Sequence, residues 1–237
     1  MQSESTSIVT KSTTESRRRL DRAQVVTAGM MVADAGGLDV LTMRKVGEAL
    51  GVEAMSLYNH VANKEDLLDA MIDVVYGEIE LPVVGSEWKS AIRRRSVSVN
   101  EALRRHPWAT PLMESRQSPG PANLRHHDSV LGTLRVGGFP LLLAAHAYST
   151  IDSYLYGFAL QAKNLPFDTF EETEAVMEMM MAQMPVDQYP HLAEIASELV
   201  MQPGYSYNNE FEFGLDLVLD ALERQLNSDA ARGGASV

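Results

Sequence analysis

Cationic, amide and aromatic side chains gather in one short stretch, LTMRKVGEALGVEAMSLYNHVANKEDLLDAM, at residues 41–71. Guanidinium and ammonium groups pair with phosphates, whereas guanidinium and amide groups can also read the edges of bases. The residue types therefore indicate contact with double-stranded DNA. The candidate contact residues are Thr42, Arg44, Lys45, Ala54, Met55, Ser56, Tyr58, Asn59, His60 and Lys64.

Two short helices must position these side chains. Thr42 is a suitable N-cap for a helix that ends at Leu50, and Gly51 can supply the left-handed residue that follows. A second helix over about 53–60 completes a helix-turn-helix, and Asn63 caps a longer third helix. Four aliphatic positions are expected to face inward and leave the opposite face free for a groove: Val46, Leu50, Leu57 and Val61. The alternative is a packed helical hairpin with no part in DNA binding.

The distribution of charge agrees with DNA contact at the front of the chain. The net charge is −12, yet residues 1–64 hold eight Lys and Arg against seven Asp and Glu. The remainder holds twelve basic and twenty-five acidic residues, so it would be repelled by a polyanion. The sequence has no cysteine, no apolar run that could span a membrane and no secretory signal, which favours the cytoplasm.

The rest of the chain predicts an all-α protein. We expect a disordered tail at 1–16, a helix-turn-helix domain at 17–64 with a connecting helix to about 80, a helical body at 81–228 and a second tail at 229–237. The helical pattern of the first helix begins at Leu20, and the AGG of residues 35–37 should stop it. Proline and glycine breaks divide the body into helices near 86–105, 108–115, 121–137, 140–163, 168–183, 191–201 and 206–227.

Residues 19–80 closely resemble the DNA-binding module of TetR-type transcriptional repressors, and the tetracycline-repressor branch in particular. The resemblance lies in the LT-x-RK start, the L-G-V-E turn, the L-Y-x-H-V helix and the N-K-x-x-LLDA helix. It implies that Arg44 contacts a base and that Ser56, Tyr58 and Lys64 reach phosphate or sugar. Ala54-Met55 and Asn59 replace the family's Gln-Pro and Trp, so the operator should differ.

Three of these roles have structural alternatives. Tyr58 and His60 can serve packing instead of the groove. Arg17, Arg18 and Arg19 can reach a minor groove as an arm or can form a solvated tail.

A weaker likeness to the family's ligand-binding and dimerisation body continues through RRHPWATPLMESRQSPGPANL and AAHAYSTIDSYLYGFALQ. It implies a homodimer that binds a small-molecule inducer and needs no cofactor. Two apolar stripes are candidates for the dimer interface, the alternative being the core of one chain. They are Ala144, Tyr148, Ile151, Leu155 and Phe158, and Phe211, Leu215, Val218 and Leu222.

The positions that contact magnesium and tetracycline in the family fall on Arg95, Val99, Met113 and Val130. A methionine thus replaces the magnesium-binding histidine, and we expect an inducer other than Mg-tetracycline. Candidate pocket residues, each with ordinary packing as its alternative, are His106, Trp108, Met113, Arg116, Tyr148 and Tyr154. Five methionines in VMEMMMAQM, 176–184, can line a lid or fill core gaps.

No enzyme motif appears in the sequence. Asp152, His146 and Ser149 could form a catalytic group, but their spacing is no different from chance. His126, His127 and His146 lack paired metal-ligand spacing, so no metal is expected. A ligand-responsive repressor is therefore expected. The competing hypotheses are an enzyme, or a helical interaction protein whose front module no longer binds DNA. The sequence names neither the inducer, the operator, the target genes nor the sign of regulation.

Overall fold

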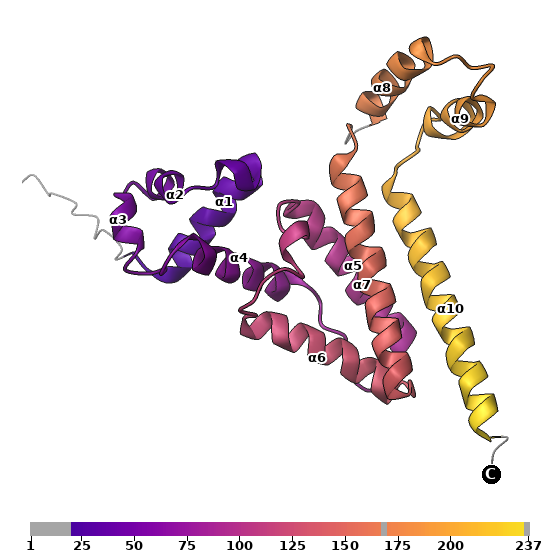
Figure 1. Ribbon diagram of the computed structural model, residues 1–237, viewed down its shortest axis with the longest axis horizontal. Coiled ribbons are helices and arrows are strands. Elements are labelled where there is room, and N and C mark those ends of the chain that lie inside the picture. The colour runs from indigo at the N-terminus through magenta and orange to yellow at the C-terminus, as the bar shows by residue number, and fades with distance from the viewer. Residues whose placement is uncertain (1–19, 167–169, 235–237) are drawn as a thin grey trace, which may run out of the picture.

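The computed structural model describes residues 20–166 and 170–234, and in those ranges the chain is helical and contains no strand. The predicted all-α class is therefore confirmed. Figure 1 shows a small group of helices at the N-terminal end beside a larger helical body. The predicted tail at 1–16 and the arginines of the predicted arm, 17–19, lie outside the described residues.

The small group contains α1 (Arg22–Val40), α2 (Met43–Leu50), α3 (Ala54–Leu57) and α4 (Lys64–Glu78). Asp21 caps α1 through a reciprocal pair of bonds with Gln24. The helix is interrupted within the predicted stop at 35–37, because Gly37 has a φ of 76°, and a further helical turn follows up to Val40.

The body contains α5 (Trp88–Arg105), α6 (Pro121–Val136), α7 (Leu141–Asn164), α8 (Phe170–Gln183), α9 (Pro190–Ile195) and α10 (Asn208–Gly234). The predicted helix at 108–115 was too long, since only a 3-10 turn forms at Thr110–Leu112. Pro111 explains the difference, because it lacks the N–H that a longer helix needs. The predicted C-terminal tail at 229–237 was wrong for residues 229–234, because α10 continues to Gly234, and residues 235–237 lie outside the described residues.

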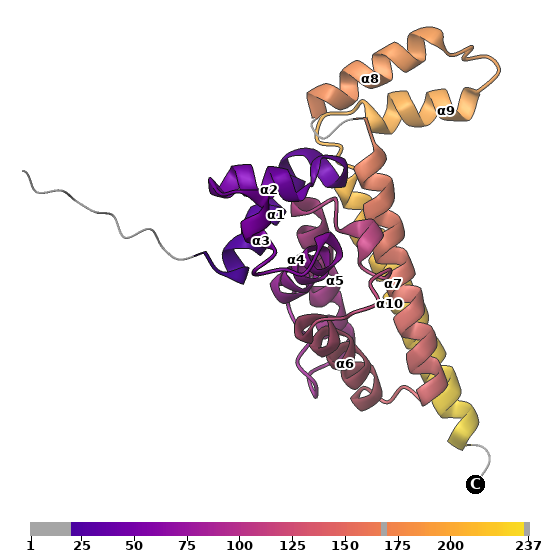
Figure 2. The same ribbon diagram turned by 60° about the vertical axis from the view of Figure 1, so that its left-hand side comes forward.

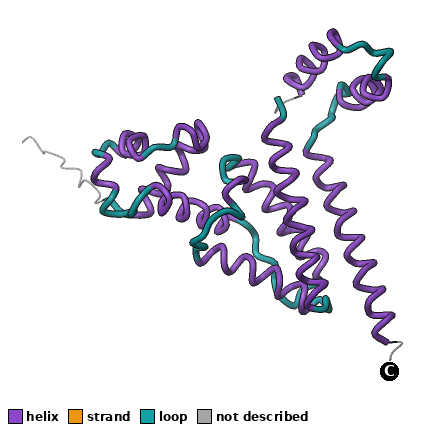
Figure 3. The backbone as a smooth tube through the Cα atoms, in the orientation of Figure 1, coloured by secondary structure: helices purple, strands orange, loops and turns teal. Residues whose placement is uncertain are grey.

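Four helices form the body's core. α5, α7 and α10 pack on one another, and α6 packs on α4, α5 and α7. The tube drawing in Figure 3 shows that loops join these helices without any sheet. Figure 2 shows the α8–α9 hairpin beyond the end of the long α7 and α10 pair. Met179 and Met180 of this hairpin are exposed, so neither fills a gap in the core of this chain.

The two apolar stripes proposed for the dimer interface lie inside a single chain, so that prediction was wrong. Ile151 and Leu155 of α7 are buried, as are Phe211 and Leu215 of α10. Phe211 packs its ring against Tyr154 and Phe158 of α7, because the stripes of these neighbouring helices face each other. The alternative, a core within the monomer, is the correct interpretation.

Candidate nucleic-acid interface and ligand site

The predicted caps and turn set the angle between α2 and α3. The Thr42 hydroxyl accepts the Lys45 N–H at 3.2 Å, and Gly51 ends α2 in the left-handed region with a φ of 68°. Val46, Leu57 and Val61 are buried as predicted, whereas Leu50 is half-buried. The second helix is shorter than predicted, since regular helix ends at Leu57 and residues 58–60 form a turn.

The outward face of α3 and its following turn is accessible. The exposed residues there are Met55, Tyr58 and Asn59, and Ala54, Ser56 and His60 are half-buried. Met55 is 75% exposed and Tyr58 is 44% exposed, although both have large apolar parts. A protruding thioether and phenol beside polar groups form a surface suited to base edges and sugars.

The cations of α2 share one carboxylate. Arg44 Nε lies 3.5 Å from Glu48 Oε1, and Lys45 Nζ lies 3.5 Å from Glu48 Oε2. All three side chains are at least half exposed, so water screens these pairs and they contribute little to stability. Both cations are therefore accessible to a phosphate or a base.

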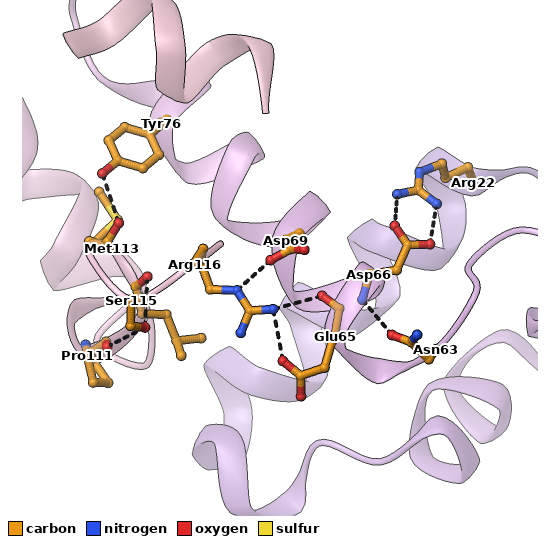
Figure 4. A network of polar contacts seen from close by, with 11 residues as sticks. Arg22, Asn63, Glu65, Asp66, Asp69, Tyr76, Pro111, Met113, Ser115 and Arg116 are labelled. Atoms are coloured by element: carbon orange, nitrogen blue, oxygen red, sulfur yellow. Dashed lines mark hydrogen bonds and ion pairs between the residues drawn. The ribbon is translucent and has the colours of Figure 1, made fainter. Parts of the chain in front are cut away.

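The sequence did not predict the role of Arg22, which binds both α4 and the turn at residues 58–60 that follows α3. Its guanidinium donates to both carboxylate oxygens of Asp66, at 2.6 and 2.9 Å (Figure 4). It also donates to the His60 carbonyl at 2.9 Å. Asp66 also accepts the Ala62 N–H. The hydrogen bonds from Arg22 lower the pKa of Asp66 to about 2. α1 thereby holds α4 and the turn after α3 in register.

The body contacts α4 in its first two turns and again near its C-terminal end. Figure 4 shows Arg116 reaching the first two turns of α4, where it pairs with Asp69 and Glu65 at 2.5 and 2.9 Å. Tyr76 donates its hydroxyl to the Met113 carbonyl at 3.2 Å. The 113–116 segment is therefore attached to α4 at two places.

Three buried polar side chains meet in the centre of the body. Arg95 of α5 is fully buried and lies 2.8 Å from Asp152 Oδ1 of α7. Its Nε donates to His126 Nε2 of α6 at 3.1 Å. Arg95 follows Trp88, Ala91 and Ile92 on the buried side of α5, so helical spacing could have identified it.

This cluster contains polar atoms that have no hydrogen-bond partner. They are Nδ1 of His126, Oδ2 of Asp152 and the Tyr156 hydroxyl. Burial, together with the Arg95 cation, lowers the pKa of His126 to about 2, so the ring is neutral at pH 7. Because Nε2 accepts from Arg95, Nδ1 carries the proton and is a buried donor. Unpaired buried groups of this kind are costly, and they occur where a ligand or water completes them.

The structure separates the six predicted pocket residues. Met113 and Tyr148 border the central cluster, since Met113 is buried beside Tyr76 and Tyr148 hydrogen-bonds His127. Arg116 contacts α4, and Tyr154 donates to the Phe211 carbonyl of α10 at 2.8 Å. His106 and Trp108 instead contact Asp34 of α1.

The other candidate sites are not assembled. Asp152 is paired with Arg95, whereas His146 and Ser149 are exposed, so the three do not form a catalytic group. Within residues 20–166 and 170–234, no group of three or more His, Asp or Glu could hold a metal ion. No helix among the residues described is long and apolar enough to cross a membrane.

Known proteins match both parts of the chain. The family profile "Bacterial regulatory proteins, tetR family" matches residues 25–71, and the profile "Tetracyclin repressor-like, C-terminal domain" matches residues 81–226. The chain belongs to the TetR family.

Individual TetR-family proteins are similar over most of the chain. The HTH-type transcriptional repressor DrrR1 of Streptomyces coeruleorubidus is 32% identical over 213 residues, which are 86% of this chain and 77% of that protein. The tetracycline repressor protein class D of Escherichia coli is 28% identical over 217 residues, 89% of this chain and 92% of that one. A crystal structure described as a possible TetR family transcriptional regulator from Streptomyces coelicolor A3(2) has 28% identity and a TM-score of 0.71, covering 86% of this chain and 99% of that one.

Membership of the TetR family confirms the resemblance drawn from residues 19–80 and the weaker one in the body. The two matched profiles are separated by residues 72–80, which cover the second half of α4 and the start of the segment that leads to α5. The protein is therefore a TetR-family transcriptional regulator with a DNA-binding helix-turn-helix and a helical C-terminal domain.

Proposed function

We propose that the protein is a homodimeric repressor that leaves a palindromic operator when a small molecule binds its body. The proposal rests on the contacts of α4, which joins the two domains and is bound to both. Arg22 ties α4 to the helix-turn-helix, and Arg116 ties it to the body. A ligand that moves the 113–116 segment would tilt α4 and change the separation of the two recognition helices. Two half-sites require a separation of roughly 34 Å, so a small tilt disrupts the match.

Each DNA contact has a proposed chemical role. Arg44 reads guanine O6 and N7 with two parallel bonds, and Asn59 reads adenine. Ser56, Tyr58 and Lys64 hold phosphate or sugar, and the N-terminus of α2 beside Thr42 presents N–H groups to a phosphate. The remaining candidates, Lys45, Ala54, Met55 and His60, line the edge of the same surface.

Selection of DNA from a random pool, repeated at several salt concentrations, tests the operator proposal. We expect a palindrome whose affinity falls steeply with salt. Arg44→Ala should weaken binding by about 5- to 150-fold and relax the preference at one base pair. Arg94→Ala is the matched control, because Arg94 is equally a surface cation but lies on α5 and pairs with Glu80. Failure of the folded dimer to enrich any palindrome would contradict the proposal.

We place the inducer at the central cluster of Arg95, His126 and Asp152. The unpaired Asp152 oxygen needs a donor and His126 Nδ1–H needs an acceptor, so a hydroxyl-bearing organic molecule would satisfy both. Arg95 is already neutralised by Asp152, which favours an uncharged ligand over an anion. His106, Trp108 and Tyr154 are not assigned to this site.

The inducer should not be Mg-tetracycline. Met113 offers only a thioether, which is a poor ligand for magnesium, and the nearby Arg95 cation repels a metal ion. We therefore expect tetracycline with magnesium chloride to leave the operator complex intact at concentrations that saturate tetracycline-binding relatives. Release of operator DNA by this mixture would overturn the assignment.

The proposed dimer uses the outer faces of α7 and α10. Phe213 and Leu217 lie one turn apart on α10 and are 66% and 54% exposed, and Leu142 and Leu160 are exposed on α7. Leu217→Lys should give a monomer in light scattering and abolish palindrome binding, whereas Leu192→Lys on the exposed α9 should not.

The alternative is a helical small-molecule-binding protein or an enzyme with a vestigial DNA-binding module. It would be supported by ligand binding or turnover in a protein that ignores DNA. We favour the repressor, acting in the cytoplasm, because the capped helix-turn-helix keeps its cations and recognition face accessible.

A further inference from the structure

Asp34 of α1 joins the DNA-binding domain to the far end of α5. Trp108 donates its indole N–H to Asp34 Oδ1 at 2.6 Å, and His106 Nδ1 lies 2.7 Å from the same oxygen. Trp108 is 2% exposed and His106 is 8% exposed, so two nearly buried rings hold one carboxylate. A hydrogen bond to an ionised acceptor is about twice as strong as a neutral one.

The same imidazole also reaches the end of α4. His106 Nε2 lies 3.2 Å from Glu78, and Arg105 donates to Glu78 at 2.9 Å. His106 is the C-cap residue directly after α5, so any movement of that end of the helix carries the ring with it. Three helices, α1, α4 and α5, therefore meet at one side chain.

This junction fixes α1 at a second point. Arg22 ties the N-terminal end of α1 to α4, and Asp34 ties its C-terminal half to the body. Because α1 packs on both α2 and α4, its tilt determines where the recognition surface lies. The body can consequently act on the helix-turn-helix along α1 as well as along α4.

We propose that Asp34, held by Trp108 and His106, is a positioning residue that fixes the angle of the DNA-binding domain on the body. Loss of the junction frees this angle and weakens operator binding, although none of the three side chains touches DNA. The proposal rests on the proposed operator-binding function only for its affinity measurement.

The absence of cysteine from the sequence permits a direct test of the angle. Spin labels at Ala49→Cys, exposed on α2, and Glu101→Cys, exposed on α5, report the distance between the domains. Dilution with an excess of unlabelled protein restricts the signal to labels within one chain. Asp34→Ala removes the acceptor, and Asp39→Asn, exposed on the same helix, is the matched control.

Trp108→Phe is the second variant, because it removes the indole N–H and keeps a ring in the buried site. We expect both Asp34→Ala and Trp108→Phe to broaden or shift the distance distribution. We also expect both to reduce affinity for the selected operator at least about fivefold, the lower end of ordinary coupling between sites. The helical content should be unchanged, and the Asp39 variant should match the parent protein.

An unchanged distance distribution in both variants would overturn the proposal, even if affinity fell. A changed distribution with unchanged affinity would overturn it as well, because the angle would then have no effect on binding. If the parent protein selects no operator, the proposed function fails, and the distance measurement alone decides whether Asp34 fixes the angle.

Discussion

Replacement of Gly47 in α2 by alanine should displace α3, because there is no room for the added methyl group. Gly47 is buried in α2, and a Cβ at this position would lie 2.8 Å from the Val52 carbonyl oxygen and 3.2 Å from the Ala54 nitrogen. Both neighbours are backbone atoms of the turn and of α3, so neither can rotate away. Gly47→Ala must therefore push α3 away from α2.

The expected magnitude comes from two opposing effects. Alanine stabilises a helix interior by about 1 kcal/mol relative to glycine. Overpacking of a well-packed site costs about 1–3 kcal/mol. Gly77 of α4 offers the matched control, since its nearest contact for a new Cβ is Ala122 at 3.9 Å. Gly77→Ala should raise the free energy of unfolding by about 0.5–1 kcal/mol, whereas Gly47→Ala should leave it unchanged or lower it by up to about 2 kcal/mol.

Thermal unfolding of both variants at one protein concentration measures this difference. For a chain of this size, 1 kcal/mol shifts the Tm by about 2–4 °C. Gly47→Ala should also weaken operator binding, because the recognition surface moves with α3. A Gly47 variant as stable as the Gly77 variant, with unchanged operator affinity, would refute the reasoning from backbone contact.

Three further predictions concern the buried cluster and a helix cap. Asp152→Asn should lower the free energy of unfolding by about 3–5 kcal/mol in urea titrations, because it leaves the Arg95 charge uncompensated, and Arg95→Met combined with Asp152→Leu should recover most of the loss. His126, whose pKa is lowered to about 2 by burial, is neutral in the fold but protonates in the unfolded chain below about pH 6.5. As the pH is lowered from about 6 to about 3, His126 should therefore reduce the free energy of unfolding by about 1.4 kcal/mol per pH unit. His126→Gln should remove this contribution in urea titrations across that range. Thr42→Val should cost about 1 kcal/mol by thermal unfolding through loss of its hydrogen bond to Lys45, whereas Thr42→Ser should be nearly neutral.

Local signals in the sequence were sufficient for the helix-turn-helix. Thr42, Gly51 and Asn63 each act within four residues of their own position, so sequence order alone reveals them. The inward aliphatic positions follow from helical spacing for the same reason. Family resemblance identified the domain. Residue spacing alone fits both a DNA-binding helix-turn-helix and a packed helical hairpin.

Contacts between distant segments could not be predicted in this way. In the sequence Arg22 is only one of several N-terminal cations, because no neighbouring residue shows that Asp66 lies opposite it. His106 and Trp108 are candidate pocket residues in the sequence because they lie in the segment that resembles the family's ligand-binding body. They contact Asp34 instead, which lies far away in sequence. The dimer stripes failed for a related reason: an apolar stripe shows that a face is covered, not whether the same chain covers it.

Glu48 adds a consequence for the search along a genome. Its exposed carboxylate is displaced from Arg44 and Lys45 at little cost, but its negative charge remains beside any DNA that contacts α2. Non-operator DNA offers little beyond phosphate contacts, so this repulsion removes a larger share of its binding than of operator binding. We therefore expect Glu48 to shorten the time that the protein spends on wrong sequences more than the time that it spends at the operator.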